Sequence, residues 1–278
     1  MKTKLFLGTV LLILTSTVVA QQGNELLIYY APIDYRDSTY RDEGKITGIY
    51  GAFRPEPGYV WEGAVENINL SYQSLDDLDQ TDITLAFTRQ KQNRHAYRMG
   101  FHSISTTHIE TDSSVTWFAG FNRYHPYDDL YGGTLYYTRH PDSDRQVWQF
   151  VPKVQKYLGD IITTGTFLIE GKLNLINVLE EGNSDTYFSA EGDITWYYRS
   201  FQLMVGAWAG EQIYAVRNDG FTVYNLPYKH TGGFKFQAGY AVTNNTSIKL
   251  GIAQELVTET DGVKSDVTIY MLSLGYTF

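Results

Sequence analysis

Two acidic residues at close spacing are the first candidates for chemistry in this sequence. Glu191 and Asp193 stand two positions apart in an alternating stretch from Asp185 to Tyr198, so on an extended chain they lie on one face, about 7 Å apart. Such a pair could share a proton as an acid–base site. The favoured interpretation is that they pair with cations from other stretches, such as Lys153, Lys235 and Lys249, and shape the field of a polar interior.

The histidines give little support to an enzyme. His102 lies within a predicted strand beside Arg98 on the same face, and its neighbour Ser103 points the other way, which excludes a local Ser–His pair. The other histidines fall at turns or strand ends, and no pair of them has metal-ligand spacing; they are His95, His108, His125, His140 and His230. We therefore predict no catalytic residue, no metal site and no cofactor, although an envelope hydrolase or acyltransferase stays open.

The predicted interior is defined by one shared property, a position on the polar face of an alternating stretch. The side chains expected to line a pore are Arg98, His102, Lys153, Gln155, Glu191, Asp193, Lys235, Gln237 and Lys249. A charged pair backed by apolar residues is unfavourable in a dry core but favourable where the inner face meets water. The pattern therefore predicts strands with a lipid-facing side and a hydrated side.

Period-two alternation recurs along the whole chain after residue 24, which predicts an all-β protein. We expect strands at about 25–31, 45–53, 59–72, 82–90, 95–104, 115–124, 130–139, 147–158, 161–170, 185–198, 201–212, 230–242, 247–254 and from 266 to the end. Short and long connections alternate between them. The expected fold is a transmembrane up-and-down antiparallel β-barrel of about 14 strands, or 12 if the first hairpin lies outside the barrel.

Both ends of the chain agree with secretion to a membrane. Lys2 and Lys4 precede an apolar run and a small-residue site at Ala20, which predicts a signal peptide at residues 1–20 and a barrel domain at residues 21–278. The last strand alternates apolar and small residues and ends in an aromatic residue. Its apolar face carries Tyr270, Leu272, Leu274, Tyr276 and Phe278.

The composition narrows the class of protein. The chain has no cysteine, 23 Tyr, 25 Gly and a formal net charge of −9. The absence of cysteine excludes disulfides and thiolate metal ligands, and the acidic balance argues against nucleic acid as a partner. Trp117, Trp148, Trp196 and Trp208 are expected to face outward in interfacial aromatic girdles.

The terminal strand through Tyr276-Thr277-Phe278, the signal peptide and the alternating strands resemble a Gram-negative outer-membrane β-barrel of the porin-like kind. The run from Val147 to Asp160 and the last three hairpins also resemble the YaiO-type barrels. The resemblance implies an outer-membrane location after passage through the periplasm, contact with membrane lipid and lipopolysaccharide, and recognition of the last strand by the barrel-assembly machinery. The oligomeric state is left open.

The connection from Glu211 to Lys229 is the longest, and it has two interpretations. Two short apolar runs flank Asn218-Asp219-Gly220, which predicts a hairpin tip. We expect this hairpin to extend above the membrane, while a loop folded into the pore mouth is the alternative.

We thus predict a water-filled passive channel for small polar solutes or ions. A non-conducting barrel in envelope structure, export or surface interaction, with its interior charges locked in salt bridges, is the second hypothesis. An outer-membrane enzyme is the third, because only the fold suggests it.

Overall fold

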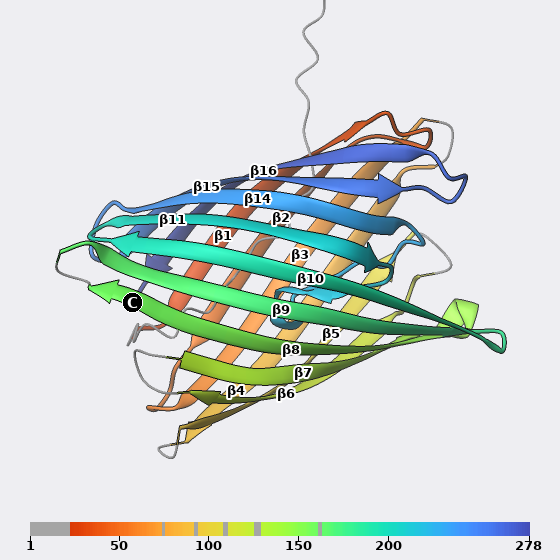
Figure 1. Ribbon diagram of the computed structural model, residues 1–278. Coiled ribbons are helices and arrows are strands. Elements are labelled where there is room, and N and C mark those ends of the chain that lie inside the picture. The colour runs from red at the N-terminus through yellow and green to blue at the C-terminus, as the bar shows by residue number, and fades with distance from the viewer. Residues whose placement is uncertain (1–22, 74–75, 92–93, 108–110, 125–128, 161–162) are drawn as a thin grey trace, which may run out of the picture.

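Fourteen long strands form one closed antiparallel sheet in the computed structural model (Figure 1). The structure describes residues 23–278 except 74–75, 92–93, 108–110, 125–128 and 161–162, so the predicted signal peptide, His108 and His125 lie outside the described residues. The barrel strands are β1 (Glu25–Arg36), β2 (Arg41–Phe53), β3 (Tyr59–Tyr72), β4 (Leu78–Lys91), β5 (His95–Thr106), β6 (Val115–Tyr124), β7 (Asp129–His140), β8 (Arg145–Asp160), β9 (Gly165–Glu180), β10 (Asn183–Tyr198), β11 (Phe201–Gln212), β14 (Lys229–Ala241), β15 (Thr246–Thr258) and β16 (Lys264–Thr277).

Each strand pairs with its neighbour in sequence, and β1 closes the ring against β16, with Glu25 opposite Thr277. The prediction of an up-and-down barrel is confirmed. The first hairpin belongs to the wall, so the barrel has 14 strands rather than the alternative 12. Both described ends lie at one end of the barrel, here called the terminus end; the opposite end is called the loop end.

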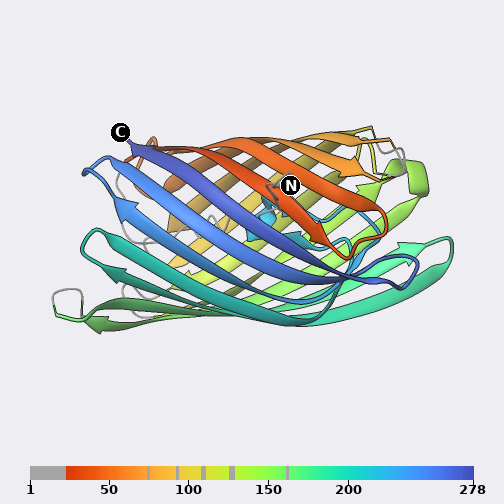
Figure 2. The ribbon, with the colours of Figure 1, turned by 90° about the horizontal axis from the view of Figure 1, so that it is seen from above.

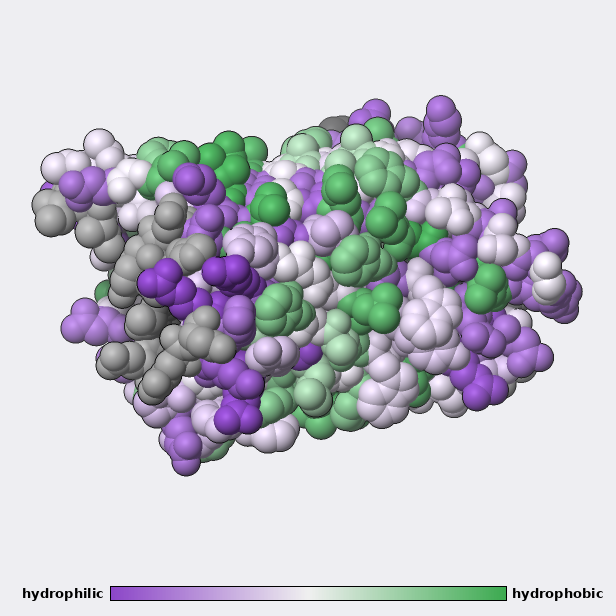
Figure 3. Space-filling view, turned by 60° about the horizontal axis from the view of Figure 1, so that its bottom comes forward, coloured by the Kyte–Doolittle hydropathy of each residue, from purple (hydrophilic) through white to green (hydrophobic). Residues whose placement is uncertain are grey.

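Alternation along the strands gives the wall two different faces. On β16, Tyr270, Leu272 and Leu274 are 43 to 47% exposed, while Ile269 and Met271 between them are at most 5% exposed. Every other barrel strand also carries exposed large apolar residues, and on the face drawn in Figure 3 they gather in an apolar belt across the middle, with hydrophilic residues concentrated toward both ends. Such a belt is the surface that a barrel presents to lipid.

Helical structure is minor. The described residues contain two 3₁₀ turns, at Pro141–Ser143 (η1) and Asn218–Gly220 (η2). In the described part of the chain, no helix has the length and apolar character needed to cross a membrane.

Two short strands are not part of the barrel wall and lie inside the barrel (Figures 1 and 2). They are β12 (Val216–Arg217) and β13 (Thr222–Val223), which pair with each other across η2. They belong to the connection between β11 and β14, and we call residues 213–228 the inner hairpin. The prediction that this hairpin extends above the membrane is wrong, and the alternative of a loop folded into the barrel is what the structure shows.

Candidate functional site

The tip of the inner hairpin is built from residues that tolerate a left-handed backbone. Asn218, Asp219 and Gly220 have φ of 52°, 54° and 99°, a region open to glycine and accessible to Asn and Asp. A Cβ on Gly220 would stand 2.4 Å from the ring of Phe118 on the wall. The sequence therefore makes a tight turn here that fits closely against β6.

Asp219 binds the wall on one side of the lumen. Its carboxylate lies 3.2 Å from Nζ of Lys153 on β8, and its carbonyl oxygen accepts a hydrogen bond of 3.4 Å from Arg98 on β5. Arg98 also forms an ion pair with Glu62 on β3. One aspartate at the hairpin tip thus connects to two strands, β5 and β8, on the same side of the barrel.

Arg217 binds a second set of wall charges. Its guanidinium lies 3.0 Å from Glu255 on β15 and 3.5 Å from Glu191 on β10, and it stacks 5.2 Å from the ring of Trp208 on β11. Glu255 also accepts hydrogen bonds from Tyr224 of the hairpin, at 2.7 and 2.9 Å. Arg217 therefore bridges two carboxylates that belong to separate strands.

The acidic pair singled out from the sequence shares one cation. Lys235 on β14 lies 2.5 Å from Glu191 and 2.8 Å from Asp193. The side chains of these three residues are only 4 to 11% exposed. The predicted pairing with Lys235 is confirmed, but the expectation that these charges are solvated is wrong, because the inner hairpin covers them.

Uncharged groups fix the backbone of the hairpin. Gln149 on β8 donates a hydrogen bond of 2.8 Å to the carbonyl of Val216 and accepts one of 2.6 Å from its amide. Asn225 donates a hydrogen bond of 2.7 Å to Gln80 on β4. Because these contacts come from β4 and β8, which are not neighbours in the ring, the hairpin backbone is held at two separate places on the wall.

The rest of the hairpin packs against an apolar surface. Val216, Phe221, Val223 and Tyr228 join one buried cluster with residues of the wall. The wall strands β1 to β4, β15 and β16 contribute most of that cluster, including Leu27, Ile33, Ile46, Tyr50, Leu70, Leu78, Val257, Val267 and Ile269. The hairpin and these wall residues therefore fill this part of the lumen as a protein core is filled.

The remaining residues predicted to line a pore have different surroundings. Lys153 pairs with Asp219 rather than with the predicted acids, Gln155 donates a hydrogen bond to Glu170, and Gln237 is 5% exposed. Lys249 on β15 is half-buried near the terminus end, and it forms no ion pair among the described residues. The nine residues thus do not form one site.

His102 is completely buried. Its Nδ1 lies 2.8 Å from the hydroxyl of Thr84, and its Nε2 lies 3.4 Å from Asp82. All three side chains are at most 3% exposed. The arrangement contains a hydroxyl, an imidazole and a carboxylate, but a substrate has no access to it, which a nucleophilic site requires.

Two further sets of residues were predicted to face outward, the tryptophans and the apolar residues of the last strand. Trp208 is 6% exposed and faces the interior, so its assignment to an outward girdle is wrong, whereas Trp117 and Trp148 are 57% and 42% exposed. The residues of the expected assembly signal face outward, at 43 to 62% exposure; their role in assembly stays a prediction.

The residues that matter most inside the barrel were not among the sequence-based candidates. Asp219, Arg217, Tyr224 and Glu255 hold the hairpin. One signal could have identified them: the connection carries several large apolar residues beside Arg217 and Asp219, and a solvated loop seldom exposes so many apolar side chains.

The comparisons with known proteins agree on the fold. No family model matches the chain, and no curated protein matches it, so the YaiO-type resemblance stays untested. Among solved structures, the chain is similar to the CymD monoaromatic hydrocarbon channel, at 9% identity and a TM-score of 0.59, covering 93% of this chain and 89% of that one. It is also similar to a bacterial polysaccharide outer membrane secretin, at 10% identity and a TM-score of 0.59, with 93% and 99% covered.

A FadL homologue of Pseudomonas aeruginosa has 9% identity and a TM-score of 0.56, with 92% of this chain and 90% of that chain covered. Identities this low carry the fold and nothing finer. The chain thus has the fold of the outer-membrane β-barrels, as its sequence predicts, and the outer membrane is the location that this fold indicates.

Proposed function

We propose that this protein is a narrow outer-membrane channel for small molecules, with the inner hairpin as its constriction. The observation that carries the proposal is the placement of residues 213–228 inside the ring, bound to β8, β10 and β15 through ion pairs and to β5 through a hydrogen bond. A wall of 14 strands encloses more space than its own side chains fill. A hairpin in that space sets the width of any path.

The similar solved structures support a channel in general terms, because several of them are described as channels or transporters of small molecules. The apolar belt supports a membrane location, and the short turns at the terminus end are typical of the periplasmic side of such barrels. The burial of His102 with Thr84 and Asp82 supports a structural role for this cluster over catalysis.

A non-conducting barrel is the second candidate, and one observation favours it. The charges around the hairpin are largely desolvated, with the side chains of Arg217, Glu191 and Glu255 at 6 to 7% exposure. Buried ion pairs of this kind cost desolvation energy and are hard to break one at a time. A hairpin held this firmly would seal the barrel.

Single-channel conductance in planar bilayers tests both candidates. The variant to compare replaces residues 213–228 with a short Gly-Ser linker, which is feasible because Gln212 already lies opposite His230 in neighbouring strands. We expect small, discrete conductance from the natural protein and a several-fold larger conductance from the variant. A control carries Glu181→Ser and Asn183→Ser at the exposed tip between β9 and β10, and should conduct like the natural protein.

The two candidates predict different records. A natural protein that never conducts, together with a hairpin-deleted variant that does, would establish the sealed barrel. Equal conductance of both proteins would mean that the hairpin does not constrict the path.

A further inference from the structure

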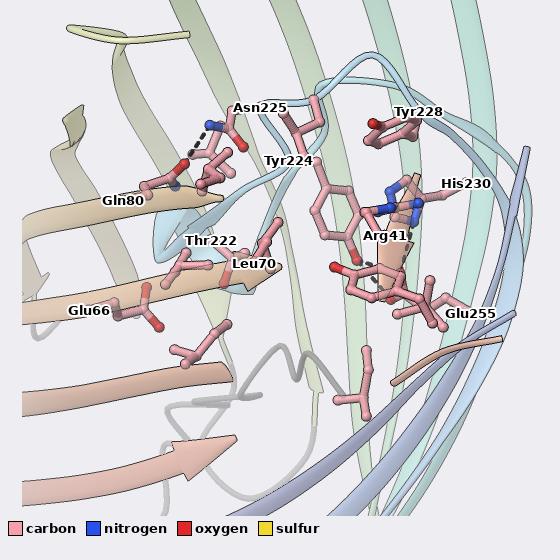
Figure 4. A pocket seen from close by; sticks show the side chains of 18 residues that line it. Arg41, Glu66, Leu70, Gln80, Thr222, Tyr224, Asn225, Tyr228, His230 and Glu255 are labelled. Atoms are coloured by element: carbon pink, nitrogen blue, oxygen red, sulfur yellow. Dashed lines mark hydrogen bonds and ion pairs between the residues drawn. The ribbon is translucent and has the colours of Figure 1, made fainter. Parts of the chain in front are cut away.

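A cavity of about 100 Å³ lies between the inner hairpin and the wall (Figure 4). On the hairpin side it is lined by Thr222 to Leu226 and Tyr228, and on the wall side by residues of β1 to β4 and β14 to β16. An apolar cavity of about 150 Å³ in another protein accepts benzene. At about 100 Å³ this space is smaller, so a compact organic molecule of comparable size requires a small shift of the hairpin that enlarges it.

Most of the lining is apolar. Ile46, Ile68, Leu70, Val267 and Ile269 form the wall side of the cavity. Burying apolar ligand surface against such side chains contributes roughly 25 cal/mol per Å² before the costs of association. A ligand for this cavity thus needs a compact aliphatic or aromatic body.

The charged groups at one end of the cavity already satisfy one another. Arg41 lies 3.2 Å from Glu259 and is sandwiched between the rings of Tyr35 and Tyr228, at 4.2 and 4.1 Å. Glu255 is bound by Arg217 and lies 2.9 Å from Nδ1 of His230. Neither group is available to attract a ligand charge.

Glu66, at the opposite end, has a different environment. Its Oε1 accepts a hydrogen bond of 2.7 Å from the hydroxyl of Tyr29, while Oε2 has no hydrogen bond and no cation within ion-pair distance among the described residues. The residue is 9% exposed and lines the cavity (Figure 4). It stands directly opposite a second carboxylate, Asp82, across β3 and β4.

Asp82 does not relieve this excess of negative charge. It is contacted by Gln80 at 2.8 Å and by His102 at 3.4 Å, and one imidazole can balance at most one of the two carboxylates. A buried carboxylate without a counter-charge is costly, and a cation that also donates hydrogen bonds would compensate it.

We propose that this cavity binds a small primary amine with a compact apolar body, its ammonium group donating to Glu66. The inference deepens the proposed function, because it names the class of solute that the constricted lumen would hold. The ammonium supplies the charge that Glu66 and Asp82 lack, and the apolar body replaces water against Leu70, Val267 and Ile269.

Calorimetric titration of the purified barrel in detergent tests this with two matched probes, isoamylamine and isoamyl alcohol. Empty micelles provide the baseline. We expect the amine to bind at least about tenfold more tightly than the alcohol, as a charge-assisted hydrogen bond implies. Equal affinities, or no binding of the amine, would overturn the proposal.

Two variants separate recognition from folding. Glu66→Gln keeps the size of the side chain and an acceptor for Tyr29, and should remove the preference for the amine while leaving alcohol binding unchanged. Val267→Phe should fill the space and weaken both probes. Both variants should keep the heat-modifiable mobility of a folded barrel. A preference that survives in Glu66→Gln would show that another group recognises the amine.

The channel proposal fails independently of this one. If the natural protein binds the amine but never conducts, the amine-binding proposal stands and the channel proposal is overturned. If it conducts but shows no preference for the amine, the channel proposal stands and the amine-binding proposal is overturned.

Discussion

The two sides of the inner hairpin are held in different ways. Toward β5, β8, β10 and β15, Asp219 and Arg217 make ion pairs and hydrogen bonds of defined direction. Toward β1 to β4 and β16 the contacts are mostly apolar: Val223 and Tyr228 join the buried cluster of the wall, and one hydrogen bond joins Asn225 to Gln80. This side contains the cavity. Directional contacts fix where a segment sits, whereas apolar contacts stabilise it without selecting one position. The comparison suggests that the charged side sets the hairpin's position and the apolar side leaves room for a ligand.

The largest effect is expected from the double substitution Glu191→Gln and Asp193→Asn. It leaves Lys235 and Arg217 with less counter-charge in a covered site, and breaking one buried pair costs about 3–5 kcal/mol. We expect the melting temperature of the barrel to fall strongly. Had the charges been solvated, as the sequence alone suggests, the loss would be roughly 0–1 kcal/mol.

The control for this experiment is Glu181→Gln at an exposed loop position, which should melt like the natural protein. If the double variant also melted unchanged, the charged side would not be holding the hairpin.

Asp219→Asn should have the next largest effect. The amide keeps the shape and one acceptor but removes the charge that faces Lys153 in a partly buried pair, so we expect a loss of about 3 kcal/mol in stability, the upper end for hydrogen bonds to a charged group. Conductance should rise, because the tip of the hairpin is released. Asp185→Asn, at an exposed position of β10, is the matched control. If the stability fell but the conductance did not rise, Asp219 would anchor the hairpin without controlling passage through the barrel.

Ile269→Ala tests the apolar side. The side chain is 2% exposed and lines the cavity, so its truncation should cost about 2–3 kcal/mol, at the low end for such a change because the neighbouring space allows relaxation. The hairpin's position should persist, since its ion pairs remain. We therefore expect lower stability with unchanged conductance. A rise matching that of Asp219→Asn would remove the distinction between the two sides.

The smallest effect on stability is expected at Glu259, which lies in the connection between β15 and β16. Burial alone would raise the pKa of Glu259, but hydrogen bonds from Ser38 and Thr39 and the charge of Arg41 outweigh it and hold the pKa below its ordinary value. The stability that the ionised Glu259 contributes is therefore complete above the ordinary carboxyl pKa and is lost as the pH falls through the lowered pKa.

Glu259→Gln isolates that contribution. The Arg41–Glu259 pair is buried, at 4% and 0% exposure, but Gln keeps an acceptor for Arg41, and the rings of Tyr35 and Tyr228 still stack on its guanidinium. The variant should therefore be less stable than the natural protein by about 1.5–2 kcal/mol at neutral pH, the low end for hydrogen bonds to a charged group. The difference in melting temperature should shrink as pH falls. A difference that stayed constant from neutral to acid pH would assign the role of Glu259 to its shape rather than its charge.

Alternation of residue types was enough to predict the wall. The inward face of β10 and the outward face of β16 follow from a period of two, because a pleated strand must point successive side chains in opposite directions. The sequence named Lys235 as one of three possible partners of Glu191 and Asp193, and the structure selects it because it lies on an inward face two strands away in the ring order.

The interior could not be predicted in the same way. The sequence indicated a turn at Asn218-Asp219-Gly220, but whether that turn lies above or within the barrel depends on partners distant in the chain, such as Lys153 and Gln149. Trp208 was misassigned for a related reason. An aromatic residue is typical of a membrane girdle, yet on β11 it occupies an inward position beneath Arg217.

The seam between β1 and β16 has a consequence for how the barrel is made. Glu25 meets Thr277 only when nearly the whole chain is present, and contacts this distant in sequence form slowly. The inner hairpin precedes β14 to β16 in the chain and lies inside the barrel, so the ring closes around it. The apolar wall surface against which the hairpin packs includes Leu27, Val267 and Ile269 from the two seam strands. This surface is therefore completed only when the ring closes. Closure and final docking of the hairpin should appear as one kinetic phase in refolding.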